Sequence, residues 1–270
     1  MIGKTNMKPN NPIDWPGSPH DFTGDYMLKH QATETTQRYI HGTRYSTWDG
    51  RVYKYSYAIG AILGGRGAQN ASNVINISEE GTVPHVIGDT FSSITLGASD
   101  GYATDGEVAE NELIGGFFVC HNPSVICRGI VANTGGDAVA IKVYLDAPIT
   151  AADATPYCEV LLNPYKYLTN NTNPGREYQS TMCVPNNNVA ATHNFWGQTW
   201  GPCFVNPGGD SGSLGDSVNE RSVYFVADGS INGAVALTGD STGHQHAGFL
   251  IEETGASNDA VPFVMLQISI

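Results

Sequence analysis

The sequence predicts an all-β protein with an antiparallel sandwich or barrel body and an extended N-terminal arm. Short apolar and β-branched runs recur along the chain, and turn residues such as Asp-Gly and Gly-Gly separate them. No window of about 12 residues keeps a helical period with capping residues. Short strands at this spacing are typical of sandwiches and barrels. The 270 residues suffice for one large β domain or two small ones.

The arm is expected to occupy residues 1–45. Several prolines between Pro9 and Pro19 exclude a helix or a central strand, because proline lacks a backbone donor and fixes φ. The segment also carries aromatic side chains for which a purely solvated tail would have little use, so we expect it to lie on its own domain or on a neighbour. The candidate partner contacts in the arm are Trp15, Phe22, Tyr26 and Tyr39.

A β-rich body is expected over residues 46–165. Its clearest strand follows the turn signal Asp49-Gly50, where residues 51–58 alternate so that Tyr53, Tyr55 and Tyr57 share one face. Further strands are predicted at residues 83–87, 91–96, 113–120, 125–131, 138–145 and 158–162.

Residues 166–270 are expected to form a second β-rich subdomain packed on the first. The polar run at 170–175 reads as a surface loop or linker. The chain ends on a β-branched hydrophobic run, which predicts a last strand docked in a sheet. Strands are predicted at residues 191–197, 222–227, 234–237, 247–252 and 261–270.

The charge content limits the choice of partners. Charged residues make up 14% of the chain, against roughly 25% in an ordinary soluble domain. Such a surface suits a protein covered by partners, although long polar, uncharged loops would give the same composition. The net charge is −13 and no cluster of Lys and Arg occurs, which argues against nucleic acid and against an anionic membrane as partners. The sequence shows no secretion signal and no apolar run of about 20 residues, so folding in a cytoplasm is expected.

Neither metal ligands nor a cofactor are predicted. The five cysteines include no C-x-x-C pair, so we expect buried free thiols. His244 and His246 would share one face of a strand and could hold a metal together, but no Cys or acidic residue at ligand spacing completes the set. Exposed loop histidines are the favoured interpretation. The acidic loop at 100–107 departs from the spacing of a calcium loop.

One motif suggests an enzyme. Residues 209–213, Gly-Asp-Ser-Gly-Ser, resemble the nucleophile motif of chymotrypsin-like serine proteases. In that family the base lies far upstream of the serine, whereas His193 precedes Ser211 by only 18 positions (211 − 193). A similar Gly-Asp-Ser at 239–241 favours a tight turn. We therefore predict no catalytic residue and no enzyme, with a GDSG-type serine hydrolase as a remote alternative.

A resemblance suggests a class of function. Residues 49–61, DGRVYKYSYAIGA, resemble a segment found in virion structural proteins of tailed bacteriophages, of the form D-G-R-x-[YF]-[RK]-[YF]-x-x-A followed by G-A. Residues 226–235 and 247–250 resemble later segments of the same proteins, in the same order. Together these pieces spread over residues 46–270. The arm at 1–45 is longer than the resemblance implies.

The resemblance implies a head decoration, or cement, protein. Its expected partners are the major capsid protein and copies of itself, often as a trimer, and its expected place is the capsid exterior after assembly in the host cytoplasm. The alternative is a virion spike or receptor- or glycan-binding module, because the aromatic residues at 195–200 could stack on sugars. Buried aromatic residues in a β core are the more common case. Trp196 and Trp200 complete the candidate partner contacts.

Overall fold

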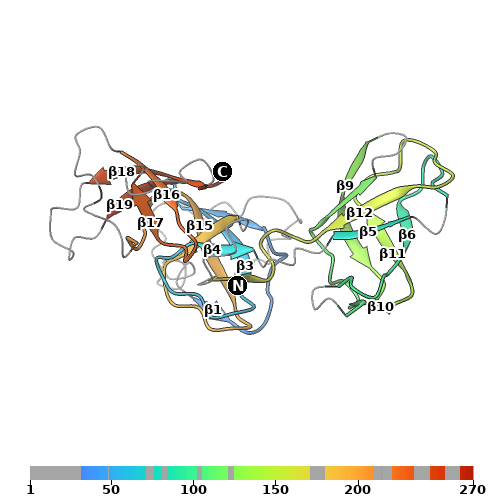
Figure 1. The fold of residues 1–270 in the computed structure, drawn as a ribbon, viewed down its shortest axis with the longest axis horizontal. Coiled ribbons are helices and arrows are strands. Elements are labelled where there is room, and N and C mark those ends of the chain that lie inside the picture. Colours follow the sequence, from blue (N-terminus) through green and yellow to red (C-terminus); the bar gives the residue numbers. More distant parts are fainter. Residues whose placement is uncertain are drawn as a thin grey trace, which may run out of the picture. The chain divides into compact units, whose positions relative to one another are not determined.

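A computed structural model describes most of the chain (Figure 1). The described residues are 32–47, 49–70, 76–80, 84–101, 105–120, 125–170, 180–208, 214, 221–233, 244–252 and 262–269. Within them the fold is all-β, as the sequence predicts: they contain no helix, and every strand-to-strand ladder is antiparallel. Accordingly, no helix capable of crossing a membrane occurs in this part of the chain.

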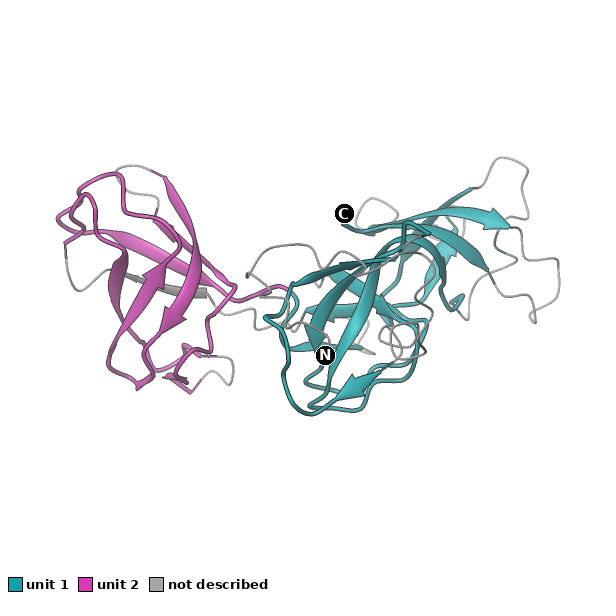
Figure 2. Cartoon of the chain, turned by 180° about the vertical axis from the view of Figure 1, so that it is seen from behind, with its two compact units in different colours: residues 1–72, 165–270 teal, residues 73–164 magenta. Residues whose placement is uncertain are grey.

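The chain forms two compact units (Figure 2). Unit 1 comprises residues 1–72 and 165–270, and unit 2 comprises residues 73–164. Residues 46–72, expected in one body with the strands that follow them, lie instead in unit 1. The reason is the pairing of Tyr55 with Trp196, which joins segments far apart in sequence. The alternation of apolar and polar residues predicts where strands lie but does not indicate which strands pair.

Unit 1 contains one large sheet. Its strands follow the order β13-β4-β14-β15-β19-β18-β16-β17, and β3 and β1 also pair with β15 while β2 pairs with β3. The strands are β1 (Thr33–Glu34), β2 (Arg44–Ser46), β3 (Val52–Tyr57), β4 (Ala68–Asn70), β13 (Leu168–Thr169), β14 (Thr181–Pro185), β15 (Asn194–Phe204), β16 (Ser222–Phe225), β17 (Ile231–Gly233), β18 (His246–Glu252) and β19 (Phe263–Gln267).

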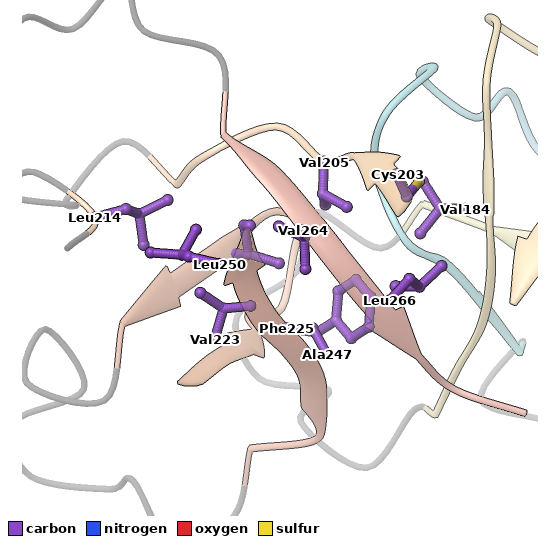
Figure 3. Close-up of a cluster of buried hydrophobic side chains, with 11 residues drawn as sticks. Val184, Cys203, Val205, Leu214, Val223, Phe225, Ala247, Leu250, Val264 and Leu266 are labelled. Carbon is purple, nitrogen blue, oxygen red and sulfur yellow. The ribbon is translucent and has the colours of Figure 1, made fainter. Parts of the chain in front are cut away.

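The long strand β15 organises unit 1. Its first half is buried on both faces: Phe195 packs into one apolar cluster and Trp196 into another. Its second half pairs with β19 and covers a third cluster on one face only. Figure 3 shows the side chains of this third cluster, which come from β14 to β19 and the connecting segments: Val184, Cys203, Val205, Leu214, Val223, Phe225, Ile231, Ala247, Leu250, Val264 and Leu266.

Unit 2 is a curled six-stranded sheet of order β5-β12-β8-β9-β11-β6, with the short pair β7 and β10 beside it. Its two end strands, β5 and β6, contact each other. On β11, Ile141, Val143 and Leu145 point inward and alternate with exposed residues. The strands are β5 (Asn76–Glu80), β6 (Phe91–Thr95), β7 (Glu107–Val108), β8 (Phe117–Cys120), β9 (Ile126–Asn133), β10 (Gly136–Asp137), β11 (Ala140–Leu145) and β12 (Tyr157–Leu161).

Most predicted strands coincide with observed ones, and the exceptions have local causes. Only the second half of the run at 113–120 is a strand, because residues 110–115 form turns that bury Leu113. In the run at 83–87, His85 makes an isolated bridge to Asp153. The run at 234–237 lies outside the described residues. The structure adds strands that the sequence analysis missed, among them β4 and β14.

Candidate docking face and pocket

The outer side of the sheet at β15, β19 and β18 carries an apolar surface. Phe204 lies directly opposite Phe263, and Met265 lies between Pro202 and Phe249. These side chains face away from the core because their neighbours on each strand point into it: Cys203, Val264 and Leu250 are all buried. We call this surface the outer face and define it as Trp200, Pro202, Phe204, Phe249, Phe263 and Met265.

Three aromatic side chains of the outer face are exposed. Phe204 is 38% exposed, Phe263 39% and Phe249 41%. Cross-strand neighbours on one face lie about 5 Å apart and diagonal ones about 7–8 Å, so the register places these side chains next to one another on the sheet. Contiguous exposed apolar patches on soluble proteins mark places where partners bind.

A pocket opens beside the outer face. Its volume is about 320 Å³, at the lower end of the range for ligand sites. Phe204, Phe263 and Pro202 form its apolar wall. Its polar wall contains Asp49, Arg51, Asn186 and Gln198. A pocket of this size accepts one side chain or one sugar ring.

The charges of the pocket are paired. Arg51 Nε lies 2.8 Å from Asp49 Oδ2, and both side chains are partly exposed. Partial burial raises the pKa of Asp49, but hydrogen bonds from Thr47 and Arg51 and the Arg51 charge outweigh it, so the pKa lies below its usual value. The pair therefore gives the pocket a donor and an acceptor with little net charge.

Unit 2 contains a different kind of cluster, which the sequence analysis missed. One ring nitrogen of His85 and the sulfurs of Cys120 and Cys158 lie within 4.8 Å of one another, and all three residues are buried. Burial and the neighbouring Cys120 raise the pKa of the Cys158 thiol, and burial lowers the pKa of His85 despite the charges of Asp153 and Asp89. The three residues are too far apart in sequence for any spacing motif to indicate them.

Protein-family models, curated proteins and solved structures were compared with this chain, and none matches it.

The predicted partner-contact residues divide into three groups. Trp15, Phe22 and Tyr26 lie outside the described residues. Tyr39 and Trp196 come together, with ring centroids 5.4 Å apart. Trp200 lies at one end of the outer face, opposite Gln267. Of the described candidates, Trp200 alone therefore belongs to the exposed patch.

Trp196 is part of an aromatic core. It is 4% exposed, and its ring lies 5.1 Å from that of Tyr55 and 5.6 Å from that of Tyr45. Tyr55 also donates a 3.0 Å hydrogen bond to Glu34, which ties the segment before β2 to this cluster. In this structure Trp196 stabilises its own unit and offers little surface to a partner.

The remaining candidates from the sequence lie elsewhere in the chain. Residues 209–213, including Ser211, and residues 239–241 lie outside the described residues. His246 packs edge-on against Tyr224, with ring centroids 5.4 Å apart. Among the residues that the structure describes, neither His244 nor His246 belongs to a group of three possible metal ligands. Four of the five cysteines are buried, as expected, whereas Cys127 is exposed.

Proposed function

We propose that this chain is a structural virion protein that binds the major capsid protein on the head of a tailed bacteriophage and stabilises the head. The observation that carries the proposal is the outer face of unit 1. The resemblance of residues 49–61, 226–235 and 247–250 to virion structural proteins supports the same class of function. The proposal assigns no reaction to any side chain.

The composition of the outer face fits a docking role. Aromatic side chains supply much of the affinity at protein interfaces, since they bury a large apolar area at a small cost in conformational entropy. The pocket between Phe204, Phe263 and the Asp49–Arg51 pair can receive a single protruding side chain of the capsid. An apolar surface with a polar pocket at its edge matches the anatomy of a protein interface.

Capsid stabilisation follows from mass action. A protein that binds only the assembled lattice stabilises that state over free capsid subunits. Copies that also contact one another raise the effective concentration of each neighbour, so modest single contacts add up to firm attachment. We propose that the chain self-associates on the lattice for this reason.

Attachment to particles tests the proposal. Recombinant chain is added to heads that lack it, and bound protein is quantified after sedimentation. The double variant Phe204→Ser, Phe263→Ser should bind at least tenfold more weakly. Tyr144→Ser is the matched control, because Tyr144 is a 37% exposed aromatic residue in unit 2.

Two outcomes would contradict parts of the proposal. If the double variant is folded and binds as well as the wild type, the outer face is not the docking surface. If an antibody to the chain fails to label virion heads, the assignment to the capsid exterior is wrong.

The N-terminal arm is proposed to add contacts. Deletion of residues 1–30, which include Trp15, Phe22 and Tyr26, should leave the thermal unfolding of the described units unchanged and should reduce occupancy on heads. Unchanged occupancy would remove the arm from the interface.

A virion spike that binds glycans is the second candidate, and the pocket is the observation that favours it. Aromatic Phe204 and Phe263 beside Asp49 and Asn186 combine a ring surface with hydrogen-bonding groups, which is the chemistry that sugars require. A glycan array would detect this function. Binding that Asn186→Ala abolishes, together with absent capsid binding, would favour it over decoration.

A further inference from the structure

The interior of unit 2 brings together three side chains that the docking proposal does not use. Cys158 on β12 lies directly opposite Cys120 on β8, and both point inward. His85 precedes β6 and is held by a backbone bridge to Asp153, with hydrogen bonds of 2.7 and 3.1 Å. His85 Nε2 lies 3.8 Å from Cys158 Sγ. The sheet register therefore fixes the two sulfurs and the imidazole around one point.

The spacing of these atoms fits a metal ion. Two sulfurs bound tetrahedrally at about 2.3 Å from Zn²⁺ lie about 3.8 Å apart, and a sulfur and an imidazole nitrogen lie slightly closer. The three atoms here are within 4.8 Å of one another, so a contraction of at most about 1.2 Å would bring them to coordination distance.

The chemistry of the donors selects the class of ion. Thiolates with an imidazole suit zinc and similar soft or borderline divalent ions, whereas Mg²⁺ and Ca²⁺ require oxygen ligands. Two thiolates also balance the charge of a divalent ion, so the bound group would be neutral overall in a buried place. Ser92 Oγ, 2.9 Å from His85 Nε2, supplies an oxygen beside the fourth position.

Buried polar atoms normally form hydrogen bonds, but two described polar atoms next to the cluster form none. In the described structure, His85 Nδ1 and Asp153 Oδ2 are both buried and form no hydrogen bond. Histidine that binds a metal through Nε2 carries its proton on Nδ1 and commonly donates it to a carboxylate. With the proton on Nδ1, His85 would have a donor and Asp153 an acceptor without a hydrogen-bond partner. The backbones of these two residues are already bridged to each other.

We propose that His85, Cys120 and Cys158 bind one thiophilic divalent cation of the Zn²⁺ class inside unit 2, and that Asp153 orients His85 by accepting its Nδ1 proton. The ion crosslinks β12, β8 and the segment before β6. Because the site is buried, the ion enters as the unit folds, and its binding energy contributes to folding.

The first test uses the full-length wild-type chain. The protein is purified after expression with added zinc, and its metal content is measured by mass spectrometry. Chelator-treated chain is then titrated with Co²⁺, whose absorption bands identify tetrahedral coordination by thiolate. We expect one ion per chain, sulfur-to-cobalt charge-transfer bands, and a lower melting temperature after zinc removal. This measurement does not depend on any variant being folded.

Variants assign the ligands. Cys120→Ser and Cys158→Ser should each weaken zinc binding by about 100-fold or more, and Asp153→Asn by about 10- to 100-fold. Cys127→Ser is the matched control. Cys127 belongs to the neighbouring strand β9, where it lies opposite Val119 of β8, and it is exposed. It should bind zinc like the wild type. Bound zinc should also protect Cys120 and Cys158 from alkylation while Cys127 reacts.

Two results would overturn the proposal. The first is a folded wild-type chain that takes up no stoichiometric zinc or Co²⁺, or whose uptake Cys158→Ser leaves unchanged. The second is a freshly purified chain in which Cys120 and Cys158 are joined as a disulfide, because directly opposed cysteines on antiparallel strands meet the distance range for that bond. A mass lower by two hydrogens, reversed by a reductant, would reveal it.

Discussion

His41 donates a 2.8 Å hydrogen bond from Nε2 to Oδ1 of Asn194, and its ring is stacked on Tyr55. The donor role follows from the Asn194 amide nitrogen, which donates to the carbonyls of Glu34 and Thr35. Burial, only partly offset by this hydrogen bond, lowers the pKa of His41 to about 4. The nearby Lys166 charge acts in the same direction.

Acid should therefore destabilise unit 1 through His41. Above pH 6.5 the residue is neutral in both states and its contribution is complete; between pH 6.5 and about 4 the unfolded chain binds a proton that the folded chain excludes. The loss should reach about 3 kcal/mol at most. Urea unfolding between pH 7 and 4 measures it, and His41→Gln should flatten the pH dependence. Equal slopes in both proteins would contradict the assignment.

The two tryptophans of β15 should have opposite roles. Trp196→Ala should cost about 3–5 kcal/mol of unfolding free energy, because it empties part of the aromatic core. Trp200→Ala should cost about 1 kcal/mol, since Trp200 is partly exposed on the outer face. Denaturant unfolding measures both. On capsids the order should reverse among folded variants: Trp200→Ala weakens attachment, and Trp196→Phe does not.

Gly248 should be intolerant of any side chain. Its φ is +144°, and a Cβ there would lie 1.9 Å from the carbonyl oxygen of Met265 on β19. Gly248→Ala should cost about 2 kcal/mol or more in stability. Gly50→Ala is the control: its φ of +84° is also left-handed, but no atom lies within 4 Å of the added methyl. It should cost about 1–2 kcal/mol. Equal losses would mean that contact with Met265 is relieved easily.

Unit 2 should fold alone. Among the described residues, the strands of its six-stranded sheet pair only with one another, and the unit is a continuous piece of chain, residues 73–164. A fragment of these residues should show a β-type circular dichroism spectrum and a single cooperative unfolding transition. A fragment that stays unfolded would show that the unit depends on the rest of the chain.

The sequence pattern was sufficient to predict most strands, but it was insufficient to predict which strands pair. The alternation of β11 and the final hydrophobic run predict strands that the structure contains, because burial of one face imposes a period of two. The tyrosine stripe was identified, but its pairing with β15 was not, since no local signal links Tyr55 to Trp196. The outer face and the His85 cluster were missed for the same reason: each depends on register between distant strands.

The discontinuity of unit 1 has a consequence for synthesis of the chain. Tyr55 and its partner Trp196 are 141 positions apart (196 − 55), and the intervening unit 2 is complete before β15 leaves the ribosome. At a synthesis rate of about 5–20 residues per second, β3 remains without its partner strand β15 for a time on the order of 10 s. During that interval its unpaired edge is open to nascent neighbours on the same polysome, so high expression levels should favour misassembly of unit 1 while unit 2 matures normally.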